Sequence, residues 1–137
     1  MKNIISGAYL SKGTIGNVGM SGSPIATFRL VGVPLQNSVT GTVVITQTVN
    51  GPDNTILIQV KGKITTRGIG KFTKVVSLSG QYLQVLSSPE DGSFLADFNA
   101  YFAVDDDWNG TGGFSYYQHK LENVPVENVK NLKEELV

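Results

Sequence analysis

The chain contains no cysteine among its 137 residues. Disulfide bonds, thiolate catalysis and cysteine-bound metal sites are therefore excluded, and a domain that needs no disulfide is typical of a reducing compartment. No apolar run approaches the roughly 18 residues of a membrane-spanning helix, and the first residues lack the long apolar segment of a signal peptide. We therefore expect a cytoplasmic protein without a membrane partner.

Charged residues are also scarce: they make up 16% of the chain and cancel to a net charge of zero. The lysine-bearing strands lack interleaved aromatic side chains, so no nucleic-acid partner is expected. The single histidine, His119, lies four residues from Ser115, which is roughly 13 Å in an extended strand and too far for a hydrogen bond between the two. No nucleophile elbow accompanies them. The sequence therefore predicts no catalytic residue and no enzyme.

Glycine, with 16 residues, and β-branched side chains are abundant instead. Residues 42–49 and 55–64 are two β-branched runs, and the Asn-Gly-Pro-Asp-Asn segment between them suits a chain reversal. In the second run Ile56, Ile58 and Val60 alternate with other residues, which is the period of a strand with one buried face. This hairpin predicts an antiparallel sheet.

Residues 94–104 alternate most regularly, with Phe94, Phe98 and Phe102 on the face that also carries alanines. Further strand patterns, separated by turn residues, cover 25–33, 71–78, 81–86, 114–119 and 121–126. We therefore predict one all-β domain over residues 1–137, either an antiparallel β-sandwich or a closed meander β-barrel of about eight strands.

The two ends of the chain have no clear strand pattern. Residues 1–23 form a glycine-rich N-terminal segment. The tail, 127–137, has apolar residues at three-to-four spacing, so a short C-terminal helix is one interpretation of it.

An acidic loop follows the alternating strand. Asp105, Asp107 and Asn109 would supply side-chain oxygens, and Thr111 a backbone carbonyl, in the spacing that opens a calcium loop, with Gly110 at the sharp turn. The twelfth position is a tyrosine rather than a bidentate glutamate, so any calcium binding would be weak. In the alternative interpretation, the aspartates only cap the turn. No other cofactor is expected.

Aromatic residues surround the same loop in the sequence: Trp108, Tyr101, Tyr116 and Tyr117. A flat apolar ring beside an amide such as that of Asn109 is what recognition of a sugar or another small ligand uses. In the alternative interpretation, Trp108 covers the open end of the sheet and belongs to the core.

Three stretches resemble a known family. They are TGTVVITQTVN at 40–50, DDW at 106–108 with FSY at 114–116, and VPV at 124–126. Together they are similar, over residues 25–130, to the small bacterial family called domain of unknown function 1842. The resemblance implies a small all-β bacterial domain and brings no catalytic activity with it.

The expected function is therefore that of a non-catalytic binding or assembly module that acts through its surface. Few charges and exposed strand edges favour self-association, so a homo-oligomer is expected. The alternative is a small-ligand or carbohydrate-binding protein that uses the Trp108 end.

Overall fold

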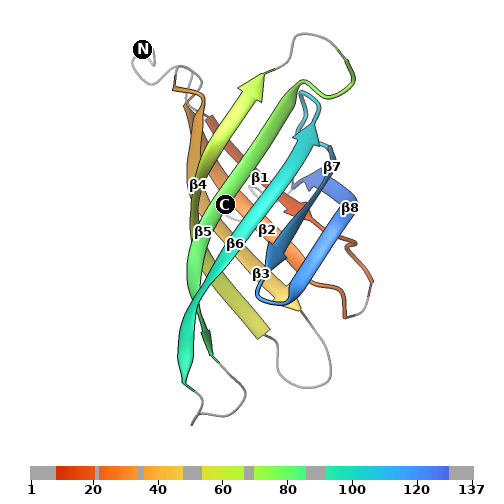
Figure 1. Cartoon of the computed structure of the whole chain (residues 1–137). Coiled ribbons are helices and arrows are strands. Elements are labelled where there is room, and N and C mark those ends of the chain that lie inside the picture. Colours follow the sequence, from red (N-terminus) through yellow and green to blue (C-terminus); the bar gives the residue numbers. More distant parts are fainter. Residues whose placement is uncertain are drawn as a thin grey trace, which may run out of the picture.

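The computed structural model describes residues 9–20, 22–33, 36–47, 54–66, 70–85 and 92–129. The strands in chain order are β1 (Tyr9–Ile15), β2 (Ile25–Val33), β3 (Ser38–Gln47), β4 (Asn54–Thr66), β5 (Lys74–Val85), β6 (Ser93–Val104), β7 (Gly110–Tyr116) and β8 (His119–Asn128). They form a closed antiparallel barrel in which each strand pairs with its sequence neighbours (Figure 1). The all-β prediction is confirmed, and the barrel is realised rather than the sandwich.

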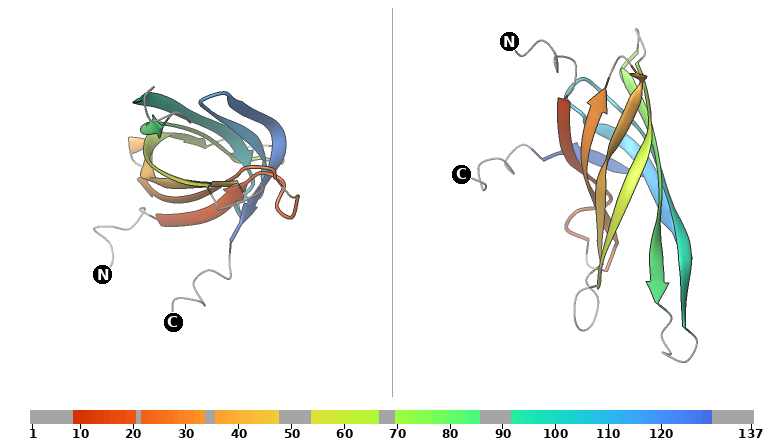
Figure 2. Two further views of the ribbon diagram at one scale, coloured as in Figure 1. Left: turned by 90° about the horizontal axis from the view of Figure 1, so that it is seen from below. Right: turned by 90° about the vertical axis from the view of Figure 1, so that its left-hand side faces the viewer.

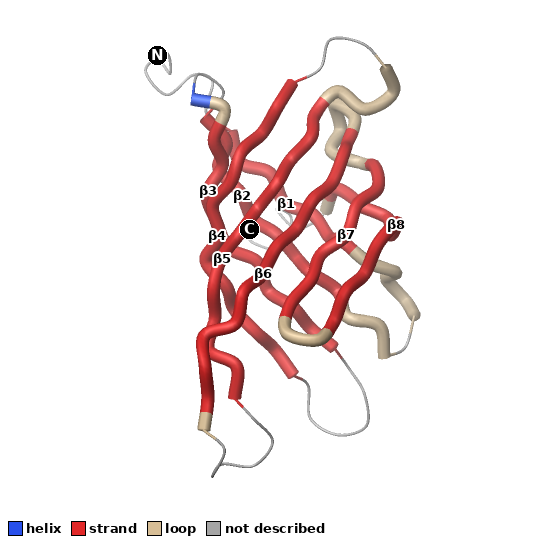
Figure 3. The backbone as a smooth tube through the Cα atoms, viewed as in Figure 1, coloured by secondary structure: helices blue, strands red, loops and turns tan. Residues whose placement is uncertain are grey.

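Strand covers most of the described chain (Figure 3). Among the described residues there is no helix long and apolar enough to cross a membrane. The tail, for which a short helix was one interpretation, begins as the end of β8. Residues 130–137 lie outside the described part, as do residues 1–8.

The ring closes where β1 meets β8 (Figure 2). Three residue pairs form this ladder, from Gly13 opposite Asn128 to Ile15 opposite Val126. At one end the ladder continues with a hydrogen bond of 2.9 Å from the Gly16 amide to the carbonyl oxygen of Pro125. The strand predicted at 121–126 lies within β8, which pairs with β7 along most of its length and with β1 only at Val126–Asn128.

The core follows the alternation that the sequence shows. Phe98 and Phe102 are fully buried, whereas Leu95 and Tyr101 on the opposite face of β6 are exposed. Phe28 of β2 stacks on Phe102 with ring centroids 5.3 Å apart. An eight-stranded barrel is just wide enough to be filled by such side chains. The predicted inward face of β6 is confirmed from Ala96 to Val104, whereas Phe94, on the same face, is 40% exposed.

Two predicted strands, 71–78 and 81–86, are one continuous strand, β5, through the Ser79–Gly80 step. Gly80 pairs with Val60 without a register shift. A Cβ at Gly80 would collide with the carbonyl oxygen of Gln59. The glycine therefore permits a close approach of β4 and β5, and it does not end a strand.

The hairpin of β5 and β6 extends beyond the barrel. The β4–β5 ladder ends at Gln59 opposite Gln81, and the β6–β7 ladder ends at Phe98 opposite Tyr116, but β5 and β6 stay paired to Val85 and Ser93. Within the described strands, residues 82–85 and 93–96 therefore pair only with each other. We call this segment the β5–β6 ribbon; it projects past the other strands in Figures 1 and 2.

Candidate functional site

The acidic loop, residues 105–109, is a tightly bonded turn between β6 and β7. One carboxylate oxygen of Asp105 accepts hydrogen bonds from the backbone amides of Asp107, at 2.9 Å, and Asn109, at 3.0 Å. The Asp105 amide donates to the carbonyl oxygen of Asn109 at 2.9 Å. A side-chain oxygen that accepts from amides two and four residues ahead stabilises a turn.

The loop is also bonded to its neighbours. The Asn109 side-chain oxygen accepts from the Asn128 amide at 2.9 Å, and the Asn128 side chain donates to the carbonyl oxygen of Asp107 at 2.8 Å. The Thr73 hydroxyl, at 2.6 Å, and the Lys74 ammonium, at 3.4 Å, donate to Asp106. The Thr73 hydrogen bond, aided by Lys74, lowers the pKa of the Asp106 carboxyl.

Thr111, the fourth proposed calcium ligand, lies on β7, and its hydroxyl donates to the carbonyl oxygen of Val124 at 3.3 Å. Among the described residues, no three acidic or histidine side chains are grouped so that they could hold a metal ion. The hydrogen bonds that Asp105 and Asn109 already make favour the alternative interpretation, in which these residues cap the turn, and calcium binding is tested by the titration described in the Discussion.

Trp108 covers one end of the barrel. Its side chain is 8% exposed, and its ring centroid lies 6.1 Å from that of Phe28 and 6.3 Å from that of Phe102. The backbone at Trp108 adopts φ 65°, a left-handed conformation that is uncommon for a bulky residue. This turn directs the ring onto the core.

The other aromatic residues that the sequence placed around this loop are spread over the molecule. Tyr101 is on the outer face of β6 and is 63% exposed. Tyr116 and Tyr117 lie at the far end of β7, because the strand runs away from the acidic loop. The predicted strand 114–119 is interrupted there by a two-residue turn at Tyr117 and Gln118, where Tyr117 adopts φ 49°. Only Trp108 and Asn109 share the loop.

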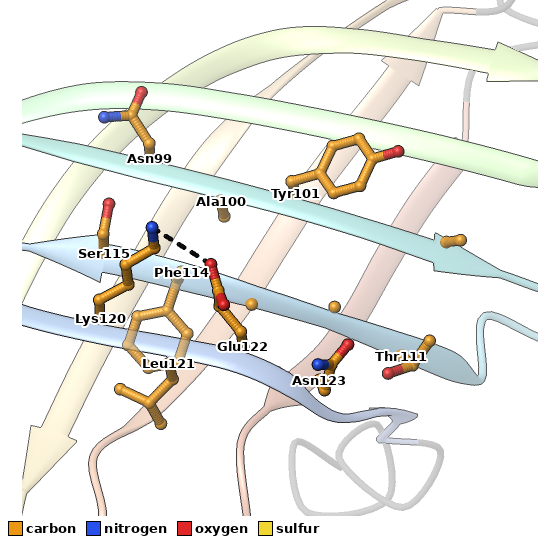
Figure 4. Close-up of a pocket in the computed structure, with 13 residues that line it drawn as sticks. Asn99, Ala100, Tyr101, Thr111, Phe114, Ser115, Lys120, Leu121, Glu122 and Asn123 are labelled. Carbon is orange, nitrogen blue, oxygen red and sulfur yellow. Dashed lines mark ion pairs between the residues drawn. The ribbon is translucent and has the colours of Figure 1, made fainter.

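Tyr101 borders a groove on the outside of the barrel. The groove, about 420 Å³ in volume, crosses β6, β7 and β8. Figure 4 shows Tyr101 on one side and Glu122 and Asn123 on the other, with β7 between them. The Lys120 ammonium and the Glu122 carboxylate form an exposed ion pair at 3.2 Å. We call this feature the outer groove; sequence reasoning identified Tyr101 but not its partners on β8.

The end of the barrel opposite Trp108 is open between β4 and β5. A pocket of about 520 Å³ lies there, with Ile45, Ile56, Tyr82, Gln84, Tyr116 and His119 among its walls. We call it the open-end pocket. It forms where the β4–β5 ladder has ended and the two strands belong to separate hairpins.

Tyr116 is the most unusual residue of this pocket. Its side chain is 4% exposed, and among the described residues its buried hydroxyl has no hydrogen-bond partner. Its ring stacks on His119, with centroids 4.7 Å apart, and on Phe114, at 5.9 Å. Burial raises the pKa of Tyr116 to about 12, and Tyr82 contributes further. The hydroxyl is therefore protonated at neutral pH and available as a donor.

Tyr82 contrasts with Tyr116. Its hydroxyl donates to the Gln84 side-chain oxygen at 2.8 Å, and burial, with Tyr117 as the lesser cause, raises its pKa. Sequence reasoning missed Tyr82 and His119 as neighbours of Tyr116. The positions of Phe114 and Tyr116, two residues apart on one face of β7, were the signal that could have placed the Tyr116 ring inside the barrel.

Comparisons with known proteins agree with the resemblance that the sequence showed. A search of the curated proteins found no match. A model of the family described as domain of unknown function (DUF1842) matches residues 6–121, which includes β1 to β7 and the start of β8. The chain therefore belongs to the DUF1842 family.

Proposed function

We propose that the protein is a non-catalytic binding and assembly module that forms a homodimer through the β5–β6 ribbon. One observation carries the proposal: the ribbon is paired only internally within the described strands, so it has two free edges. A free strand edge offers unpaired amides and carbonyls as a template for another strand.

The side chains of the ribbon favour the same conclusion. Leu83, 60% exposed, and Leu95, 65% exposed, are directly opposite each other on its outer face. Residues 82–85 and 93–96 contain no charged residue and no proline. Lysine and proline are the usual means by which a protein prevents a strand edge from pairing, and this ribbon lacks both.

A second copy of the chain is the partner that fits best. Two identical strands that pair antiparallel are related by a two-fold axis, so the free edge of β6 is complementary to itself. Such a dimer would join two ribbons into one four-stranded sheet, with leucines from both copies side by side. A two-stranded ribbon has little stability by itself, which gives the pairing a physical reason.

The test is the mass of the protein in solution by sedimentation equilibrium at high micromolar concentration. We expect a dimer for the natural chain and a monomer for the double variant Leu83→Lys/Leu95→Lys. Leu10→Lys is the matched control, because Leu10 on β1 is also 60% exposed, and it should remain dimeric. A monomeric natural chain, or a dimeric double variant, would contradict the proposal.

A second function, carbohydrate binding, is supported by the outer groove. There an exposed tyrosine ring, that of Tyr101, lies beside the amides and carboxylate of Asn99, Asn123 and Glu122. A ring for the sugar face and polar groups for its hydroxyls are the usual elements of such a site. Binding to a glycan array that Tyr101→Ala abolishes would support this function; an array without signal would remove it.

A further inference from the structure

We propose that the open-end pocket binds a small, uncharged, ring-bearing molecule whose carbonyl or amide oxygen accepts a hydrogen bond from the Tyr116 hydroxyl. This site meets the proposed dimer contact only at Leu83, which borders the pocket; Leu95 is not among the pocket walls. The Tyr116 ring faces the interior of the barrel, whereas Leu83 and Leu95 are on the outer face of the ribbon.

The unpartnered hydroxyl is the first reason. Buried polar groups in folded proteins are almost always hydrogen-bonded, and leaving one without a partner is costly. Phenylalanine at position 116 would fill the same space without this cost. Tyr116 lines the pocket, and its hydroxyl is covered by neighbouring side chains in this structure. A molecule that displaces this cover would gain a hydrogen-bond donor, which makes an acceptor oxygen the expected feature of the ligand.

The walls define the rest of the ligand. Among the described residues that line the pocket there is no lysine, arginine, aspartate or glutamate. Burying an ion without a charged partner is strongly unfavourable, so a neutral molecule fits. Ile45 and Ile56 supply apolar surface, and the rings of Tyr82, Tyr116 and His119 supply flat faces. A planar ring that carries one polar group matches these surfaces.

The position of the pocket agrees with this use. Mouths of β-barrels are common ligand sites, and pockets of this kind typically occupy about 300–1,000 Å³. The volume of about 520 Å³ falls within that range. The pocket forms because the β4–β5 ladder ends at Gln59 and Gln81, so the barrel is open beside Tyr116.

The test uses acetophenone and benzamide as probes. Toluene is the control without an acceptor oxygen, and benzoate is the control that carries a charge. Each is titrated into isotope-labelled full chain while backbone amide NMR resonances are followed. We expect saturable shifts at Tyr116, His119 and Gln84 with acetophenone and benzamide at millimolar concentration, and weaker binding of benzoate. In Tyr116→Phe, the affinity for acetophenone and benzamide should fall about five-fold, the equivalent of one neutral hydrogen bond.

Toluene is the control for the shape of the pocket. It has no acceptor, so it should bind the natural chain and Tyr116→Phe equally. Tyr101→Phe removes a hydroxyl from the outer face and should leave every affinity unchanged. Equal affinity of acetophenone for the natural chain and Tyr116→Phe, or the absence of saturable shifts at the pocket with both carbonyl probes, would overturn the proposal. Leu95→Lys changes the proposed dimer contact but no wall of the pocket. It should still bind acetophenone whatever its mass in solution, which separates this result from the outcome of the dimer test.

Discussion

Removal of the Trp108 side chain tests how the barrel is closed at the acidic-loop end. The ring is 8% exposed and lies against Phe28 and Phe102. If it is part of the core, Trp108→Ala must destabilise the whole barrel. If it were a ligand-binding platform at the surface, its loss would change stability little, because exposed substitutions usually shift the free energy of unfolding by less than about 0.5 kcal/mol.

The magnitude follows from the burial. A buried aromatic side chain removes about 200 Å² from water, and at about 25 cal/mol per Å² this corresponds to roughly 5 kcal/mol. The compactness of real unfolded chains reduces such values by about 10–40%. We therefore expect Trp108→Ala to lower the free energy of unfolding by about 3–5 kcal/mol, as for other large aromatic deletions in cores.

The left-handed backbone of Trp108, at φ 65°, leads to a second expectation, for the stability of Trp108→Gly relative to Trp108→Ala. At most positions glycine is less stable than alanine by about 0.4–1 kcal/mol, because glycine has more freedom in the unfolded chain. At a left-handed position alanine carries a cost of about 1–2 kcal/mol that glycine lacks. Trp108→Gly should therefore be no less stable than Trp108→Ala.

The assay is urea unfolding followed by circular dichroism, since each variant lacks the only tryptophan as a fluorophore. Tyr101→Ala is the control, because it removes an exposed aromatic ring from β6. A loss below about 1 kcal/mol in Trp108→Ala would refute the assignment of the ring to the core. Glycine less stable than alanine by about 1 kcal/mol would refute the left-handed backbone.

Two further results are expected. Phe98→Ala should cost about 3–5 kcal/mol in urea melts, because Phe98 is fully buried, whereas Tyr101→Ala on the exposed face of β6 should change stability by less than about 0.5 kcal/mol; similar values for both would contradict the register of β6. Calcium titrated calorimetrically into chelator-treated protein should give no heat, because the bonded oxygen of Asp105 already accepts from two amides; heat that Asp107→Ala abolishes would instead establish a calcium site.

Local patterns predicted the strands because alternation is a property of each strand alone. The face of β6 that carries Phe98 and Phe102 could be assigned without knowledge of its neighbours. The closure of the barrel could not be predicted, because the β1–β8 ladder consists of three residue pairs whose members lie more than 100 positions apart in the chain. No feature within residues 13–15 distinguishes a strand that closes a ring from one that ends a sheet.

The candidate site was harder to predict for a specific local reason. The turn between β7 and β8 uses Tyr117 at φ 49° and Gln118, where the familiar turn residues would be asparagine and glycine. Without those residues the strand pattern continued through 114–119, and Tyr116 was assigned to the acidic-loop end. The split between β4 and β5 likewise depends on where a ladder stops, which no residue within either strand indicates.

The two ends of the barrel therefore differ in the hydrogen bonding of their polar groups and in the packing of their aromatic rings. At one end Trp108 packs on the core, and the oxygens of Asp105, Asp106 and Asn109 bond to the surrounding chain. At the other end a tyrosine hydroxyl is buried without a partner in the described chain, and two hairpins separate. Sequences that specify one structure usually break local rules where function requires it. Two such departures, the unpartnered Tyr116 hydroxyl and the left-handed backbone of Tyr117, lie at the open end. Both proposals, the pocket and the ribbon, arise there, where the pairing of β4 with β5 ends.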